Sequence, residues 1–107
     1  MRVRLCVVGR PRDQELLDLH ERYATRIRRC GVAYEQVAVR PVRSRGQYSD
    51  EHVRRRESAA LLDEWDGRGV LVALHPSGRL WSSDQVAARL EGWATPCLSL
   101  LVGGPLG

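Results

Sequence analysis

The sequence predicts an α/β protein in which a mostly parallel sheet carries helices on both faces, in the order β-α-β-α-β-α-β. Two observations support this prediction. Apolar runs of strand length alternate with segments of helical periodicity, and glycine or proline separates most of them. This alternation requires crossover connections that place helices against the sheet. The 107 residues have the length of a single small domain, which we expect to span residues 1–107.

The first strand is predicted at Val3–Val8, where the run VRLCVV is apolar and β-branched and ends at Gly9. Pro11 and Asp13 then mark the beginning of a helix, and Gly31 marks its end. The predicted apolar stripe of this helix contains Leu16, Leu19, His20, Tyr23 and Ile27. Arginines occupy its other faces, so the helix is expected to be amphipathic.

The second strand is predicted at Ala33–Val39, where apolar and polar residues alternate roughly as in a half-exposed strand that ends at Pro41. Ser49 or Asp50 can cap a second helix that runs to about Trp65. The apolar positions of this helix are Val53, Ala60, Leu61 and Trp65. The segment DGRG that follows predicts a turn.

The run VLVAL at Val70–Leu74 is continuously apolar and predicts a strand that is buried on both faces. Ser82 and Gln85 have the spacing of a capping box, which begins a third helix. The predicted apolar face of that helix contains Val86, Ala87, Leu90 and Trp93. Leu98–Val102 is predicted to be a further buried strand.

The composition is typical of a soluble globular domain, with 43% hydrophobic and 28% charged residues. No apolar run approaches the roughly 20 residues of a membrane span, and the N-terminal segment lacks the features of a signal peptide. We therefore expect a cytoplasmic protein with no membrane contact. The three cysteines, Cys6, Cys30 and Cys97, have no C-x-x-C spacing, and we expect reduced packing thiols and no metal site.

The net charge is +4, and all 17 basic residues are arginine. Arginine binds phosphate well, so a basic domain of this kind is compatible with RNA binding. The run Arg54–Arg56 is usually a solvated helix face, and an RNA-facing patch is the alternative interpretation. The candidate RNA-binding residues are Arg10, Arg43, Arg45, Arg54 and Arg55.

Ligands of an open parallel sheet bind beyond the carboxyl ends of its strands. This rule selects the loops at Gly9–Arg10, His75–Gly78 and Gly103–Gly107. Glycine in such loops can let a ligand approach the backbone, but tight turns need glycine as well. The sequence contains neither of the usual nucleotide-binding motifs, G-x-x-x-x-G-K-[ST] and G-x-G-x-x-G.

The segment VLVALHPSGRLWSSDQVAARLEGW, followed by LSLLVGGPLG, resembles the ribosomal RNA large subunit methyltransferase H family. These are small SPOUT-class enzymes that methylate N3 of a pseudouridine in large-subunit rRNA. The N-terminal MRVRLCVVGR also fits the opening strand of that family. The resemblance covers the whole chain in order, is specific from Val70 onward, and is loose between Arg40 and Trp65.

The resemblance implies S-adenosylmethionine as the methyl donor, held in a trefoil knot, and ribosomal RNA or the ribosome as a partner. The cofactor-binding residues that it implies are Leu74, His75, Pro76, Gly78, Gly103 and Gly104. Two positions depart from the family pattern: His75 replaces an aspartate, and Leu106 replaces a residue that is commonly acidic. No catalytic residue is assigned.

The family continues for several dozen residues beyond the position of Gly107, and that part forms the knot. We therefore expect a SPOUT-like domain without the C-terminal trefoil knot and without a complete catalytic site in these 107 residues. The alternative is a non-catalytic, knot-less relative that acts as an RNA-binding or dimerising module. In either case we expect a homodimer. It should form through a surface other than the knot region through which members of the family dimerise.

Overall fold

The computed structural model describes residues 1–42, 46–65, 67–93 and 97–104. It confirms the predicted element order. The strands are β1 (Arg2–Val8), β2 (Ala33–Val39), β3 (Val70–Leu74) and β4 (Cys97–Val102). The helices are α1 (Gln14–Arg29), α2 (Asp50–Asp63) and α3 (Ser83–Trp93).

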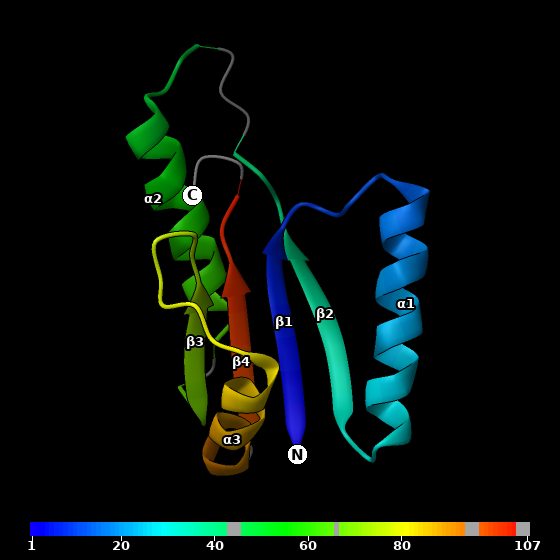
Figure 1. Ribbon diagram of the computed structural model, residues 1–107. Coiled ribbons are helices and arrows are strands. Elements are labelled where there is room, and N and C mark those ends of the chain that lie inside the picture. The colour runs from blue at the N-terminus through cyan, green and yellow to red at the C-terminus, as the bar shows by residue number, and fades with distance from the viewer. Residues whose placement is uncertain (43–45, 66, 94–96, 105–107) are drawn as a thin grey trace.

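The four strands form one sheet in the order β2-β1-β4-β3, and every pair is parallel. Strands β1 and β4 are therefore central, and β2 and β3 form the edges. Figure 1 shows that all four strands run in the same direction, with their carboxyl ends at one edge of the sheet. The predicted parallel sheet is thus confirmed.

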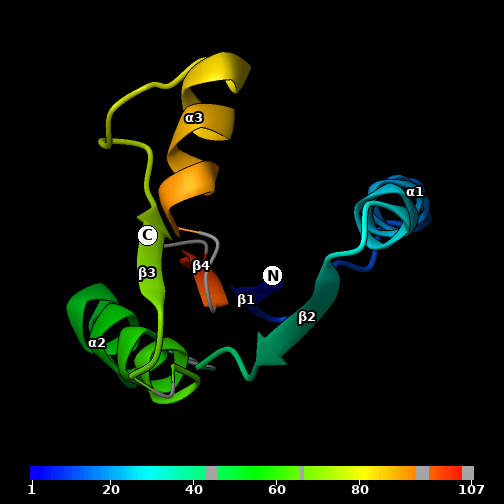
Figure 2. The ribbon, with the colours of Figure 1, turned by 90° about the horizontal axis from the view of Figure 1, so that it is seen from below.

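Helices lie on both faces of this sheet, as predicted. Figure 2 shows α2 on one face and α1 and α3 on the other. The main hydrophobic core lies under α2, where Leu61 packs with Cys6 of β1 and Leu101 of β4. Partly buried side chains from β1, β2 and β3 complete this cluster: Val8, Val37, Val39 and Leu71.

Strand β3 is not buried on both faces, so that prediction is wrong. Its first three residues are half-buried, while Ala73 and Leu74 are exposed. The reason is its place in the sheet, because β3 pairs only with β4 and forms an edge. The prediction of a buried strand is confirmed for β4, where Leu98 is 1% exposed.

The predicted apolar stripe of α1 is also partly wrong. Leu16, Leu19 and Tyr23 are exposed, and Ala24 is the buried residue of this helix. Helix α1 packs against β2, an edge strand, so only a narrow stripe of the helix is covered (Figure 2). His20 is half-buried as expected, and its Nε2 lies 2.7 Å from the hydroxyl oxygen of Tyr34.

Helix α3 begins as predicted but does not bury its apolar face. The Ser82 N–H donates to Gln85 Oε1 at 2.8 Å, and the Gln85 N–H donates to Ser82 Oγ at 3.1 Å, which confirms the capping box. Within α3, all of which the structure describes, no residue is buried. Its aromatic residue Trp93 instead contacts Trp81, at 5.6 Å between ring centroids.

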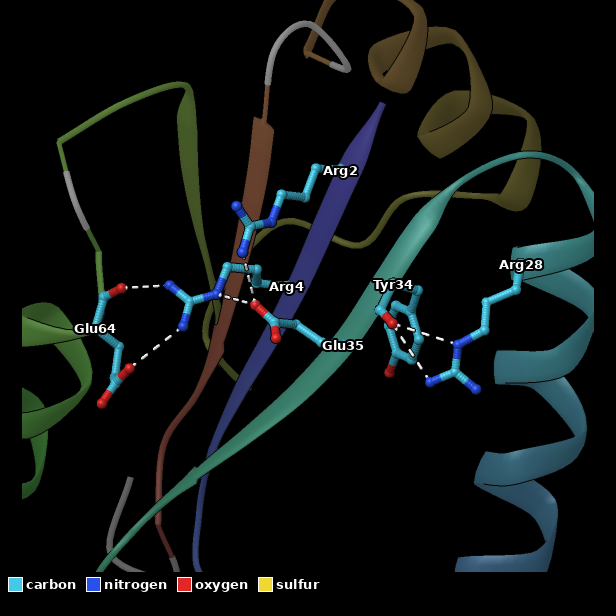
Figure 3. A network of polar contacts seen from close by, with 6 residues as sticks. All are labelled: Arg2, Arg4, Arg28, Tyr34, Glu35 and Glu64. Atoms are coloured by element: carbon cyan, nitrogen blue, oxygen red, sulfur yellow. Dashed lines mark hydrogen bonds and ion pairs between the residues drawn. The ribbon is translucent and has the colours of Figure 1, made fainter.

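Arg4 of the central strand β1 links the C-terminal end of α2 to the sheet (Figure 3). Arg4 Nη1 donates to the backbone carbonyl of Glu64 at 2.6 Å, and its Nη2 lies 3.3 Å from the Glu64 carboxylate. Arg4 Nε also donates to Glu35 of β2 at 2.8 Å, and Arg2 donates to the same oxygen at 3.2 Å. One guanidinium therefore links two strands and the end of a helix.

This network predicts a pH dependence of stability. The hydrogen bond from Arg2, opposed by desolvation and reinforced by Arg4, lowers the pKa of Glu35 from its ordinary value of 4.5. A lowered folded-state pKa stabilises the fold above about pH 4.5, and this stabilisation is lost as the pH falls through the folded-state pKa. Because Glu35 is partly solvated, Glu35→Gln should cost no more than about 1 kcal/mol at pH 7.

The measurement is urea unfolding of wild type and Glu35→Gln between pH 7 and pH 3. The difference in unfolding free energy should shrink as the pH falls below about 4.5, because protonation removes the charge that the substitution also removes. Glu91→Gln, at an exposed position of α3, is the control and should show no such convergence. A constant difference for Glu35→Gln at every pH would contradict the prediction.

Two further sequence predictions concern cysteines and membrane spans. All three cysteines are free: Cys6 is buried, Cys97 is half-buried and Cys30 is exposed. Cys6 and Cys97 thus pack in adjacent strands, as predicted, whereas the prediction of a packing residue is wrong for Cys30, which lies at the exposed C-terminal end of α1. Within the part of the chain that the structure describes, no helix has the length and apolar character that a membrane crossing requires.

Candidate functional site

The loops that follow β1, β3 and β4 lie at the same edge of the sheet (Figure 1). The register places Leu74, the last residue of β3, opposite Val102, the last residue of β4. Val102 is in turn opposite Val7 of β1. The predicted loops at His75–Gly78 and Gly103–Gly107 therefore follow neighbouring strands, and the loop at Gly9 is next in line. Of the second loop, Pro105, Leu106 and Gly107 lie outside the described residues.

The loop after β3 is a tight turn with an exposed surface. The Gly78 N–H donates to the His75 carbonyl oxygen at 2.9 Å, which closes the turn. His75 Nδ1 lies 2.6 Å from Ser77 Oγ and 3.1 Å from the Ser77 backbone nitrogen, so the ring is held by its own turn. Leu74 is 50% exposed beside it. This arrangement offers backbone groups and an apolar side chain to a ligand.

The loop after β4 lies against a buried carboxylate. A Cβ atom added to Gly104 would be only 2.6 Å from Glu57 Oε1 and 3.3 Å from a methyl carbon of Val8. Glu57 belongs to α2 and is 4% exposed. Its Oε2 accepts a hydrogen bond from the backbone N–H of Val42 at 3.0 Å. Gly104 therefore sits where a larger residue would collide with this carboxylate.

Glu57 was missed by the sequence interpretation, although a signal for it exists. Val53, Glu57 and Leu61 are spaced four residues apart and share one face of α2, and all three are buried. The sequence predicts Val53 and Leu61 as apolar positions of this helix. An acidic residue between them at the same spacing marks a buried carboxylate, which requires a specific partner in the fold.

The candidate RNA-binding residues occupy separate positions. Arg10 follows Gly9 at the carboxyl end of β1, and Arg54 and Arg55 are exposed in the first two turns of α2. Arg55 Nη2 pairs with Glu51 at 2.6 Å in an exposed i,i+4 ion pair. Arg43 and Arg45 lie outside the described residues.

Two hollows in the surface are lined by residues other than those of the loops after β3 and β4, and the larger one borders the candidate loop at Gly9–Arg10. One, of about 480 Å³, is lined by residues of α1 and β2 together with Arg10, and the other, of about 320 Å³, includes Arg2 and Tyr34. Residues 74–78 and Gly103 are instead exposed. Among the residues that the structure describes, no group of three or more histidine, cysteine or acidic side chains could hold a metal ion.

Comparison with known proteins adds an independent finding. A family model described as "Predicted SPOUT methyltransferase" matches residues 1–107. A protein of Marinomonas sp. named "Ribosomal RNA large subunit methyltransferase H" is 34% identical over 110 residues, covering 100% of this chain and 70% of that protein. The protein of the same name from Pseudomonas aeruginosa is 32% identical with the same coverage, and that from Azotobacter vinelandii is also 32% identical.

Proposed function

Because the chain belongs to the SPOUT methyltransferase family, we propose that it acts in methyl transfer from S-adenosylmethionine to ribosomal RNA, with N3 of a pseudouridine as the acceptor. The observation that carries the proposal is the position of two loops, His75–Gly78 and Gly103–Gly104. They follow neighbouring parallel strands at one sheet edge, which is where open α/β sheets bind ligands. The names of the relatives supply the class of substrate.

The described residues fit this cofactor in two respects, and Gly104 shapes the same edge of the sheet. Leu74 is half-exposed and can contact the apolar face of an adenine ring. The turn at His75–Gly78 and the loop at Gly103 present backbone amide and carbonyl groups that can hydrogen-bond to the polar groups of the ligand. Gly104 lacks a side chain where a Cβ would collide with Glu57, which keeps the backbone close to the buried carboxylate.

In the proposed mechanism, S-adenosylmethionine supplies an electrophilic methyl group when it is bound. The residues of this chain contribute by holding the reactants in place, since orientation and proximity alone can lower a barrier by several kcal/mol. Leu74 and the two loops would hold one face of the cofactor. The arginines Arg10, Arg54 and Arg55 are proposed to contact RNA phosphates near the same edge.

The described residues form only one wall of such a site, because Leu74, His75 and Gly103 are all exposed. Ligand sites normally bury most of their ligand, so we propose that these 107 residues alone bind the cofactor weakly and transfer methyl groups poorly. The second candidate function, an RNA-binding or dimerising module, is favoured by the same exposure. The dimer, its surface and the cytoplasmic location stay predictions.

Titration of the purified chain with S-adenosylmethionine in a calorimeter tests the proposal. We expect saturable binding of one cofactor per chain, and we expect Leu74→Asp to weaken it by on the order of tenfold, because the adenine loses an apolar contact. Leu16→Asp is the matched control: Leu16 is 55% exposed against 50% for Leu74 but lies on α1. An acidic residue in the first turn of a helix is well tolerated there.

Absence of binding at millimolar cofactor would contradict the proposed function. Salt-sensitive binding of an rRNA fragment by the same sample would then support the RNA-binding module. Equal weakening by Leu74→Asp and Leu16→Asp would show that the cofactor binds elsewhere.

A further inference from the structure

Glu57 is a buried acidic residue on a helix face that is otherwise apolar. It occupies the middle of the core-facing stripe of α2, between Val53 and Leu61, and is 4% exposed. Burial of a carboxylate is costly unless hydrogen bonds compensate it, and an apolar side chain at this position would fill the space at lower cost. The carboxylate therefore calls for a role beyond packing.

The contacts of Glu57 join two segments that are far apart in the sequence. Its Oε2 accepts the backbone N–H of Val42, in the segment that follows β2. Its Oε1 lies beside Gly104, in the loop that follows β4. Both segments leave the sheet at its carboxyl edge, so one carboxylate contacts the backbone of two loops at the candidate site.

Gly104 has no side chain, and the space where a Cβ would lie is taken up by the Glu57 carboxylate. An added Cβ would lie 2.6 Å from Oε1 and 3.2 Å from the carboxylate carbon, closer than packed atoms tolerate. The glycine lets the loop backbone rest against the carboxylate. Because Val42 holds the other oxygen at 3.0 Å and the side chain is buried, the carboxylate has little room to retreat.

We propose that Glu57 is a positioning residue that holds the Gly103–Gly104 loop in the conformation that receives the cofactor. The proposal rests on the proposed function for its ligand, but the contact itself can be tested separately. Glu57 acts through the backbone of the loop and does not touch the reacting atoms. The hydrogen bond that its Oε2 accepts from the Val42 N–H at 3.0 Å fixes the orientation of the side chain against the loop.

The experiment compares Glu57→Leu and Glu57→Gln with wild type in the full chain by three measurements: urea unfolding, amide hydrogen exchange and calorimetric titration with S-adenosylmethionine. Glu57→Leu should remain folded, because relief of the burial cost of the acidic group offsets the loss of the Val42 hydrogen bond. The Val42 and Gly104 amides should exchange on the order of tenfold faster, and the cofactor affinity should fall on the order of tenfold.

Glu57→Gln tests the acceptor separately from the charge. Its side-chain carbonyl can still accept the Val42 N–H, so this variant should recover most of the exchange protection and most of the affinity. A residue with only a packing role would instead lose affinity in proportion to stability. Affinity that falls while stability is retained thus identifies positioning.

A double-mutant cycle with Gly104→Ala tests the contact itself. Alone, Gly104→Ala should destabilise the loop because its methyl group meets the carboxylate, and in the Glu57→Ala background the same change should be tolerated. Gly92→Ala is the control, since nothing lies within 4 Å of a Cβ at that position.

The proposal is overturned if Glu57→Leu leaves the exchange rates of Val42 and Gly104 unchanged, or if the Glu57 and Gly104 substitutions are additive. If wild type does not bind the cofactor, the proposed function fails. The exchange rates and the cycle then still report whether Glu57 positions the loop.

Discussion

Leu98→Ala is expected to lower the free energy of unfolding by about 2–5 kcal/mol, the range typical of large-to-small changes in a core. Leu98 lies in the central strand β4, opposite Val3 of β1 and Val70 of β3, and is 1% exposed. Val3 and Val70 share its face of the sheet and are held in place by their own strands, so they can fill only part of the space that the side chain leaves. Because domains of this size have total stabilities of about 5–15 kcal/mol, this single change removes a large share.

Urea unfolding followed by far-ultraviolet circular dichroism measures the effect as a lower midpoint with an unchanged slope. Leu80→Ala is the matched control, because the same chemical change is made at a side chain that is 98% exposed. The control should alter the unfolding free energy by no more than about 0.5 kcal/mol. Similar losses for the two variants would mean that Leu98 is not a core residue.

The second large effect is expected for Gly69→Ala. This change should lower the free energy of unfolding by about 2–5 kcal/mol, because backbone strain and steric overlap act together. Gly69 precedes β3 and has a φ angle of +75°, which L-residues adopt only at a cost. A Cβ atom there would also overlap the backbone carbonyl oxygen of Cys97 and lie 2.9 Å from its carbonyl carbon. Since a strand backbone cannot move aside cheaply, the pairing of β3 with β4 should be disturbed.

Gly67→Ala separates the two causes. Gly67 has a φ angle of +80° in the same connection, but nothing lies within 4 Å of an added Cβ. Its substitution should cost about 1 kcal/mol, the penalty of the left-handed conformation alone. The excess loss for Gly69→Ala, measured by urea unfolding of both variants, is the contribution of the overlap. Equal losses of unfolding free energy for Gly67→Ala and Gly69→Ala would exclude a contribution from steric overlap.

Local features were predicted well because their causes lie within a few residues. Asp13 and Ser49 cap their helices through side-chain oxygens that accept nearby backbone N–H groups, and Ser82 pairs with Gln85 as its spacing indicates. The observed bounds of β2 are those of the predicted strand. Capping and alternation depend on neighbours in the sequence, so the sequence reveals them directly.

The predictions that are wrong all concern how far a strand or a side chain is exposed to solvent. β3 is as apolar as β4, yet β3 is an edge strand and β4 is central. Leu16, Leu19 and Tyr23 repeat at helical spacing, yet they are exposed. Hydrophobic periodicity shows that a face is apolar but not whether another element covers it, because that depends on strand order and on where each helix packs.

For the candidate site as well, some features follow from the sequence and others only from the tertiary structure. The sequence by itself determined the order of strands and helices, the glycine-containing loops after β3 and β4, and the family resemblance, since each depends on residue type and spacing. Only the tertiary structure decided that β3 and β4 are neighbours and that Glu57 lies buried beside Gly104. The physical reason is that burial of a charge is costly in isolation. It becomes acceptable only where folding brings a backbone N–H donor such as that of Val42 to the carboxylate.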